Sequence, residues 1–199
     1  MLMRKISAII LLLSAAVSLY AGSSIGVSIA PDWSWNGSGG GSTDLLFTAD
    51  GANYFGDRHG IGPEYGIGVV FPLNTWEEGR VESVAGSPYG FAFRIGLGYR
   101  YDTENVVGVF VGAGIRGKLQ MYNDRPLPDQ SVRLFTLDVY GRAGIDFSIM
   151  NAISISLGLM AGGPVYSDAT LISGGVSLSS DYRRDGFFIS PFVGAAILY

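Results

Sequence analysis

The sequence contains no cysteine and only one histidine, His59. The absence of cysteine excludes a disulfide scaffold, a thiolate metal site and a lipid-modified N-terminal cysteine. The chain has 13 Lys and Arg residues against 17 Asp and Glu residues, and this balance gives no indication of a nucleic-acid partner. The dispersed aspartates Asp168, Asp181 and Asp185 lack the spacing of a calcium-binding loop. We therefore expect neither a metal site nor a cofactor.

Long apolar runs are also missing. No segment after residue 21 reaches the ~18 apolar residues that a membrane-spanning helix needs. Residues 1–21 have the features of a cleaved secretory signal, with the basic pair Arg4-Lys5, an apolar stretch over residues 6–13 and the site Leu19-Tyr20-Ala21. This pattern predicts that residues 22–199 form one exported domain without a helical anchor.

The sequence is instead rich in alternation of period two, most clearly between residues 89 and 121. Odd positions from Tyr89 to Tyr101 are apolar or aromatic, while the even positions hold glycine, alanine and the two arginines Arg94 and Arg100. A polar turn at residues 102–105 precedes a second run, from Val107, with the same alternation. Two such runs joined by a tight turn predict a β-hairpin.

The composition of the two faces indicates which one meets solvent. The less apolar face is mostly glycine with a few Arg and Lys residues, which suits a crowded barrel interior better than a hydrated surface. The other face is apolar, with Tyr89 and Phe91 near one end and Tyr99 and Tyr101 near the other. Such a face matches a wall that contacts outer-membrane lipid between aromatic girdles.

The same alternation divides the rest of the chain into eight strands. We predict them at residues 24–35, 43–51, 60–73, 89–101, 107–121, 131–147, 153–165 and 186–199. Short turns at 102–105 and 148–151 face the periplasm, and longer connections at 36–42, 74–88, 122–130 and 167–185 face outward, the last with room to extend the seventh strand beyond the membrane. A second interpretation places residues 43–51 in a loop and the missing strand at 75–84, but it would turn charged residues such as Glu78 and Arg80 toward lipid.

This arrangement resembles the small eight-stranded outer-membrane barrels of the OmpA transmembrane-domain and OmpX type. The resemblance rests on the signal peptide, the eight alternating segments, the alternation of short turns with longer loops, and the C-terminal pattern. It implies an all-β, eight-stranded antiparallel transmembrane up-and-down β-barrel in the outer membrane, and recognition by the barrel assembly machinery. The residues of the implied assembly signal are Phe187, Ile189, Val193, Ile197 and Tyr199. Such an architectural likeness says little about individual function.

An eight-stranded barrel is just wide enough for side chains to fill its interior. The charged residues predicted to face inward are Glu64, Arg94, Arg100, Arg116, Lys118, Asp138, Arg142 and Asp146. Counting from the short turns places Arg94 and Arg116 near the height of Asp138, and Arg100 near Asp146. Because unpaired buried charges are costly, we expect ion-pair clusters across the lumen.

Three functions are compatible with this pattern. The leading hypothesis is a structural or surface-interaction role, in which the outward loops supply any binding of an extracellular ligand. A narrow pore for ions or small solutes is the second. A lipid-modifying enzyme is the third, and it would need a histidine beside a serine or an acid. His59 lies near a predicted periplasmic turn, away from the outer leaflet, so we expect no enzyme activity.

Overall fold

The computed structural model describes residues 23–37, 39–56, 59–77, 80–83, 88–103, 106–123, 130–149, 152–173, 176–180 and 186–198. The strands are β1 (Ser23–Asn36), β2 (Gly41–Asn53), β3 (His59–Glu77), β4 (Arg80–Ser83), β5 (Tyr89–Asp102), β6 (Val107–Asn123), β7 (Gln130–Ile149), β8 (Ile153–Ser173), β9 (Val176–Ser180) and β10 (Gly186–Leu198). Nowhere in these ranges is there a helix with the length and apolar character to cross a membrane. The signal peptide predicted at residues 1–21, and Tyr199, lie outside the described residues.

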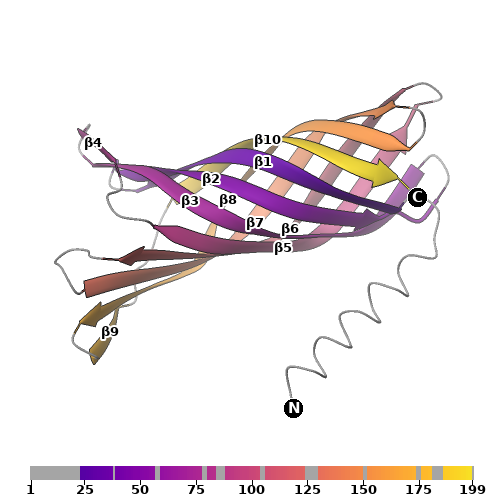
Figure 1. The fold of residues 1–199 in the computed structure, drawn as a ribbon. Helices are drawn as coiled ribbons and strands as arrows, with labels where there is room; N and C mark the ends of the chain where they lie inside the picture. The colour runs from indigo at the N-terminus through magenta and orange to yellow at the C-terminus, as the bar shows by residue number, and fades with distance from the viewer. Residues whose placement is uncertain are drawn as a thin grey trace, which may run out of the picture.

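Eight of the strands close into a ring, which Figure 1 shows from the side. Each pairs antiparallel with its neighbours, and β10 completes the ring by pairing with β8 on one side and β1 on the other. A path that starts at Ser24 of β1 and steps from each residue to its direct partner on the next strand goes once around the ring. It returns to β1 at Ser34, which lies ten residues further along the chain. This stagger requires strands tilted by roughly 35–45° to the barrel axis. The predicted eight-stranded antiparallel barrel is confirmed.

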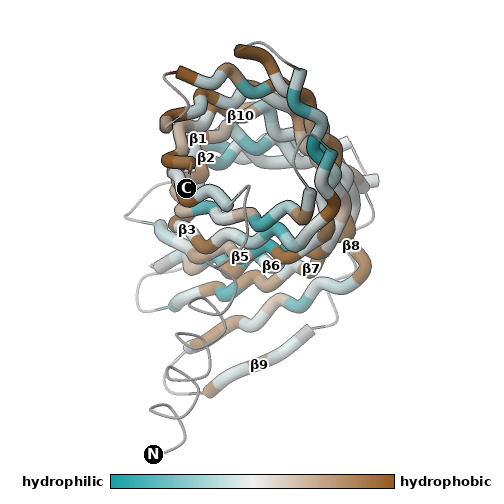
Figure 2. Tube along the Cα trace, turned by 90° about the vertical axis from the view of Figure 1, so that its right-hand side faces the viewer, coloured by the Kyte–Doolittle hydropathy of each residue, from teal (hydrophilic) through white to brown (hydrophobic). Residues whose placement is uncertain are grey.

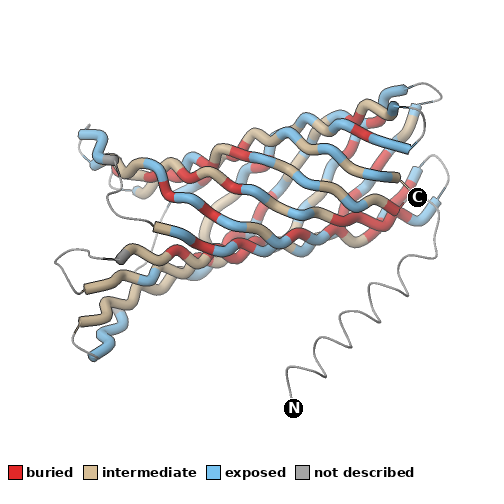
Figure 3. The backbone as a smooth tube through the Cα atoms, viewed as in Figure 1, coloured by how far each residue is buried: buried red, intermediate tan, exposed pale blue. Residues whose placement is uncertain are grey.

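The apolar face of the wall points outward and the polar face points into the lumen, as predicted. Exposed and buried positions alternate along the strands (Figure 3), and the exposed positions are the apolar ones. Ile67 is 67% exposed and Leu97 is 62% exposed, whereas Arg116 and Lys118 are 2% and 1% exposed. Seen from the end of the ring in Figure 2, apolar and polar segments alternate around it. A protein with this distribution has its hydrophobic surface outside and its charges inside.

Several predicted strand ends are wrong, because segments interpreted as loops belong to strands. Residues 74–77 continue β3, and β4 then pairs with them as a short hairpin outside the ring. Ser42 lies in β2, so the connection predicted at 36–42 is only residues 37–40. Since β2 is in the ring and β4 is not, the alternative with an extra wall strand at 75–84 is also wrong.

Two β-bulges explain why β3 and β8 run further than predicted. The pairing of β2 with β3 shifts between Thr43 and Asp44, which leaves Leu73 as an extra residue on β3. The pairing of β7 with β8 shifts between Leu137 and Asp138, which leaves Val165 as an extra residue on β8. An extra residue reverses which positions face inward. The alternation therefore changes phase within each strand, and a search for one continuous phase ends too early.

Beyond the bulges the strands continue past the ring at the end opposite the chain termini (Figure 1). One flap consists of the ends of β1, β2 and β3 with β4. The other is a longer sheet in the order β6-β7-β8-β9, over residues 122–123, 130–137, 164–173 and 176–180, which we call the outer sheet. The predicted extension of the seventh strand is thus present as the end of β8, which continues past the ring to Ser173.

Candidate functional site

The outer half of the lumen holds a buried ion cluster, which we call the outer ion cluster and which joins Asp32, Asp44, Arg116, Lys118 and Asp138. The guanidinium of Arg116 lies 2.7 Å from Asp32 and 2.8 Å from Asp138. The Lys118 ammonium lies 2.9 Å from Asp32 and 2.7 Å from Asp44. The exposed fraction of each side chain is 6% or less. Every charge in this cluster therefore has an opposite charge within reach.

The strand register explains why these residues meet. Arg116 and Asp138 are direct partners on β6 and β7, so this pair follows from one hairpin. Asp32 and Asp44 are direct partners on β1 and β2, and two like charges opposite each other repel. The cations from β6 reach across the lumen and neutralise both. Arg116 also lies 3.5 Å from the ring centroid of Phe188, a cation–π contact in a desolvated site.

An apolar layer fills the middle of the lumen. Ala30, Leu46, Val70 and Ala92 form a buried cluster, and Phe192 packs against it. Phe192 also packs against a second cluster formed by Tyr140, Met160 and Phe188. The side chains of opposite walls thus interdigitate, as expected for a barrel of this strand number.

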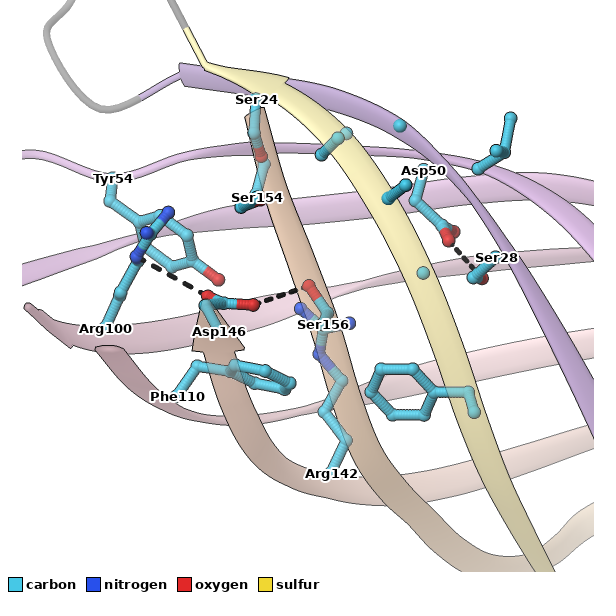
Figure 4. Close-up of a pocket in the computed structure, with 18 of the residues that line it drawn as sticks. Ser24, Ser28, Asp50, Tyr54, Arg100, Phe110, Arg142, Asp146, Ser154 and Ser156 are labelled. Atoms are coloured by element: carbon cyan, nitrogen blue, oxygen red, sulfur yellow. Dashed lines mark hydrogen bonds and ion pairs between the residues drawn. The ribbon is translucent and has the colours of Figure 1, made fainter. Parts of the chain in front are cut away.

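On the side of this layer nearer the chain termini, a small polar cavity of about 70 Å³ is lined by residues that include Arg94, Arg100 and Asp146 (Figure 4). Arg94 lies 2.9 Å from Asp50. Arg100 lies 3.5 Å from Asp146, which also accepts a hydrogen bond of 2.5 Å from Ser156. A polar cavity of this size has room for several water molecules.

Glu64 occupies the space between two glycines on the lumen face. One of its oxygens, Oε1, accepts hydrogen bonds from the Tyr54 hydroxyl and from Arg142, while Oε2 has no partner among the described residues. A Cβ on Gly98 would collide with Oε1, and one on Gly112 would lie 2.8 Å from Oε2. The glycines leave the room that this buried carboxylate and its partners need.

We predict that Gly98→Ala lowers the free energy of unfolding by about 1–3 kcal/mol, because the new methyl group displaces Glu64 from Tyr54 and Arg142. Denaturant titration of the refolded protein measures this change. Gly141→Ala is the matched control, since a Cβ there would have its nearest atom 3.9 Å away. Equal stability of the two variants would contradict this account of the inward glycines.

The structure places all eight charged residues predicted for the lumen on its inner face, though not always with the expected neighbour. Arg116 pairs with Asp138 and Arg100 with Asp146. Arg94 is in register with Arg116 and Asp138, as predicted, but its ion-pair partner is Asp50. Sequence reasoning missed further polar lumen residues, among them Asp32, Asp44, Asp50, Tyr54 and Gln120. The three aspartates have even numbers in strands whose odd positions are apolar. This pattern would have indicated that they face inward.

The remaining candidates lie on the wall and not in the lumen. His59 begins β3 at the end that carries the termini, where its ring stacks on Tyr101 at 4.7 Å and Nδ1 lies 3.1 Å from the Tyr99 hydroxyl. No group of three potential metal ligands is present within the described ranges. Four residues of the C-terminal pattern, Phe187, Ile189, Val193 and Ile197, lie on β10 and pair with β1.

The sequence matches no protein-family model and no curated protein. The fold is similar to those of three solved outer-membrane proteins. Neisserial surface protein A has a TM-score of 0.64 at 7% identity, over 89% of this chain and 97% of that one. Ail, the attachment invasion locus protein of Yersinia pestis, has a TM-score of 0.55 at 12% identity, over 91% and 100%. A major outer membrane protein from Thermus thermophilus has 0.50 at 13%, over 89% and 99%. The chain therefore has the fold of the small eight-stranded outer-membrane barrels.

Proposed function

We propose that this protein is an outer-membrane β-barrel that interacts with other molecules at the cell surface through its outer sheet. In this proposal, the signal peptide at residues 1–21 directs export, and outer-membrane lipid surrounds the apolar wall. The C-terminal residues on β10 are proposed to be what the barrel assembly machinery recognises. Loss of assembly in a variant with Phe187, Val193 and Ile197 changed to serine would support that last point.

The aromatic residues at the outer rim support a membrane position. Trp35 stacks on Phe187 with ring centroids 4.7 Å apart, and Trp76 meets Trp35 edge-on at 6.1 Å. All three come from strands that reach the outer end of the ring. A cluster of large aromatic rings at one level of an apolar wall is typical of the membrane–water interface.

The filled lumen favours a surface role over a pore. The apolar layer around Phe192 and the outer ion cluster lie one above the other, and the cavity beside them measures only about 70 Å³. Passage of a solute would have to separate paired charges in a desolvated site, which is costly. The proposed role is also not catalytic, because His59 lies far from the outer sheet and its ring is engaged by Tyr99 and Tyr101.

The observation that carries the proposal is the outer sheet itself. A barrel that only sealed or anchored would have no need for strands that continue past the ring, yet β8 runs to Ser173 and β9 pairs with its end. Among proteins of similar fold, Ail was crystallised with the heparin analogue sucrose octasulfate. Chains of this architecture can therefore hold an extracellular molecule, although β9 here carries no cation that would attract a polyanion.

We predict that deleting residues 169–180, with an Asn-Gly turn in their place, abolishes surface binding and leaves the barrel folded. Cells that display the full chain should adhere to cultured epithelial cells or to immobilised matrix proteins, and cells that display the deletion variant should not. Both proteins should keep the heat-modifiable gel mobility of a closed barrel. A replacement of residues 103–106 by the same turn, at the opposite end, is the control and should not change adhesion. Equal adhesion by the full chain and the deletion variant would refute the proposal.

A further inference from the structure

A cavity of about 520 Å³ lies at the outer end of the barrel, between the flap that carries β4 and the outer sheet. Figure 1 shows these two sheets as separate extensions of the wall. We call the space between them the mouth cleft. Its lining includes Glu77, Arg80 and Glu82 from the flap, and Tyr122 and Leu134 from the outer sheet. The volume is within the range of about 300–1,000 Å³ that is usual for ligand sites.

The flap supplies the mouth cleft with charged groups that have no partner of their own. Glu77 and Arg80 are direct partners on β3 and β4, and Glu82 lies two residues beyond Arg80, so the three side chains project from one face. No ion pair or side-chain hydrogen bond joins any of them to another described residue. Arg80 can neutralise only one of the two carboxylates. The cleft therefore keeps a net negative charge, unlike the outer ion cluster, in which every charge is paired.

The outer sheet supplies the opposite wall, which is apolar. Tyr122 of β6 is the direct partner of Val132 on β7, and Val132 is the partner of Leu171 on β8. Leu171 is in turn the partner of Leu178 on β9, which is 64% exposed. Direct partners project from the same face of a sheet. These four side chains therefore form one row across four strands, which we call the apolar row, and it begins in the mouth cleft at Tyr122.

The two walls together determine which kind of ligand fits. The negative charge repels polyanions, and an uncharged apolar ligand would desolvate the carboxylates of Glu77 and Glu82 without pairing them. A lysine or arginine side chain meets both demands. Its apolar stem can lie on Tyr122 and Leu134 while its cation reaches the carboxylates and the aromatic ring. A ligand with one basic face and one apolar face is thus complementary to the cleft.

The spacing of the apolar row favours a helical ligand over an extended one. Neighbouring strands are about 4.8 Å apart, so the row is about 14 Å long. Apolar residues on one face of an α-helix recur once per turn, about every 5.4 Å, whereas those of a strand recur at every second residue, about every 6.7 Å. The spacing of the row is closer to that of the helix, and about three helical turns would cover it.

We propose that the mouth cleft binds a basic amphipathic helix of a partner protein. The apolar face of the helix packs on the apolar row, and its lysine or arginine side chains pair with Glu77 and Glu82. This inference rests on the proposed surface role and names the chemistry of its partner.

The test uses the full chain in nanodiscs of zwitterionic lipid, with empty nanodiscs as the background. The probe is a fluorescein-labelled peptide whose leucines recur once per helical turn, acetyl-Ala-Lys-Leu-Ala-Lys-Lys-Leu-Lys-Ala-Leu-Lys-Lys-Ala-Leu-amide. A second peptide has the same composition but alternates Leu with Lys, so its leucines share one face only when it is extended. In fluorescence anisotropy, we expect the first peptide to bind about tenfold more tightly than the second.

The charged wall is tested by the double variant Glu77→Gln, Glu82→Gln, which removes the negative charge and keeps the shape of the side chains. We expect it to weaken binding of the helical peptide about tenfold and to remove most of the dependence of binding on salt. Asp168→Asn is the control for a general attraction to acidic groups, because Asp168 projects from the opposite face of the outer sheet. It should bind within twofold of the natural chain.

The apolar wall is tested by Leu178→Ser, which should weaken binding about fivefold. Val81→Ser is its matched control, since Val81 is 71% exposed and projects from the face of the flap opposite to Arg80 and Glu82. It should leave binding within twofold. All variants should keep the heat-modifiable gel mobility of the closed barrel.

Unchanged binding by the Glu77→Gln, Glu82→Gln variant, equal binding of the two peptides, or no binding to the natural chain would overturn the inference. Association of the protein's own nanodiscs without peptide, if Leu178→Ser removed it, would also overturn it in favour of a second copy. Adhesion of cells that display the double glutamine variant, at the level of the natural chain, would overturn the inference and leave the surface role standing. Failure of the deletion experiment would remove both.

Discussion

Replacing Arg116 with methionine should lower the free energy of unfolding by about 3–5 kcal/mol, the usual cost of leaving a buried charge without its partner. Arg116 is the only cation that pairs with Asp138 among the described residues, and it shares Asp32 with Lys118. Methionine restores most of the lost volume, so the change reports on charge more than on packing. Urea titration of the refolded barrel in lipid vesicles, followed by tryptophan fluorescence, measures the loss.

Two further variants separate this electrostatic cost from a general sensitivity of the lumen. Adding Asp138→Asn to the methionine variant removes the stranded carboxylate, and should recover a large part of the lost stability. Arg94→Met breaks a single pair whose side chains are 11% and 18% exposed beside the polar cavity, so it should cost less than half as much. If Arg94→Met proved as damaging as Arg116→Met, the outer ion cluster would not be the main electrostatic constraint in this barrel.

The order and number of the wall strands could be predicted because lipid and lumen impose opposite demands on successive residues. Alternation in the hairpin of β5 and β6 is uninterrupted, and its predicted limits agree closely with the observed ones. The predicted ends of β3 and β8 come too early, because Leu73 and Val165 are bulge residues that reverse which positions of the strand face inward. Nothing in the local composition distinguishes an extra residue from the end of a strand, since the bulge is visible only against the partner strand.

In the lumen, too, contacts between neighbouring strands could be predicted from the sequence, whereas contacts across the barrel could not. Arg116 and Asp138 could be matched because they sit on neighbouring strands at countable distances from the connecting turns. The contact of Arg116 with Asp32 joins residues 84 positions apart across the barrel, and its existence depends on the stagger of ten residues around the whole ring. Spacing along the chain does not determine that stagger, so the cross-lumen partners of Arg116 and Lys118 could not be found from sequence.

Replacing Ile67 with arginine should lower the free energy of unfolding in lipid vesicles by about 2–4 kcal/mol, the cost of a cation on the lipid face near the bilayer midplane. Ile67 lies near the middle of β3 between Ala49 and Phe93, and its side chain points out of the barrel. The arginine would have no lumen partner there. Unfolding by denaturant from vesicles of defined thickness measures the effect.

Val81→Arg is the matched control, because it places the same side chain at a similarly exposed site outside the wall. Val81 is 71% exposed on β4, compared with 67% for Ile67, but β4 pairs only with the end of β3 beyond the ring. Surface substitutions in water usually change stability by no more than about 0.5 kcal/mol, so Val81→Arg should be nearly neutral. The two sites share their exposure and differ in the surrounding solvent. A small effect at both would mean that water surrounds the wall, and a large effect at Ile67 alone would mean that hydrocarbon does.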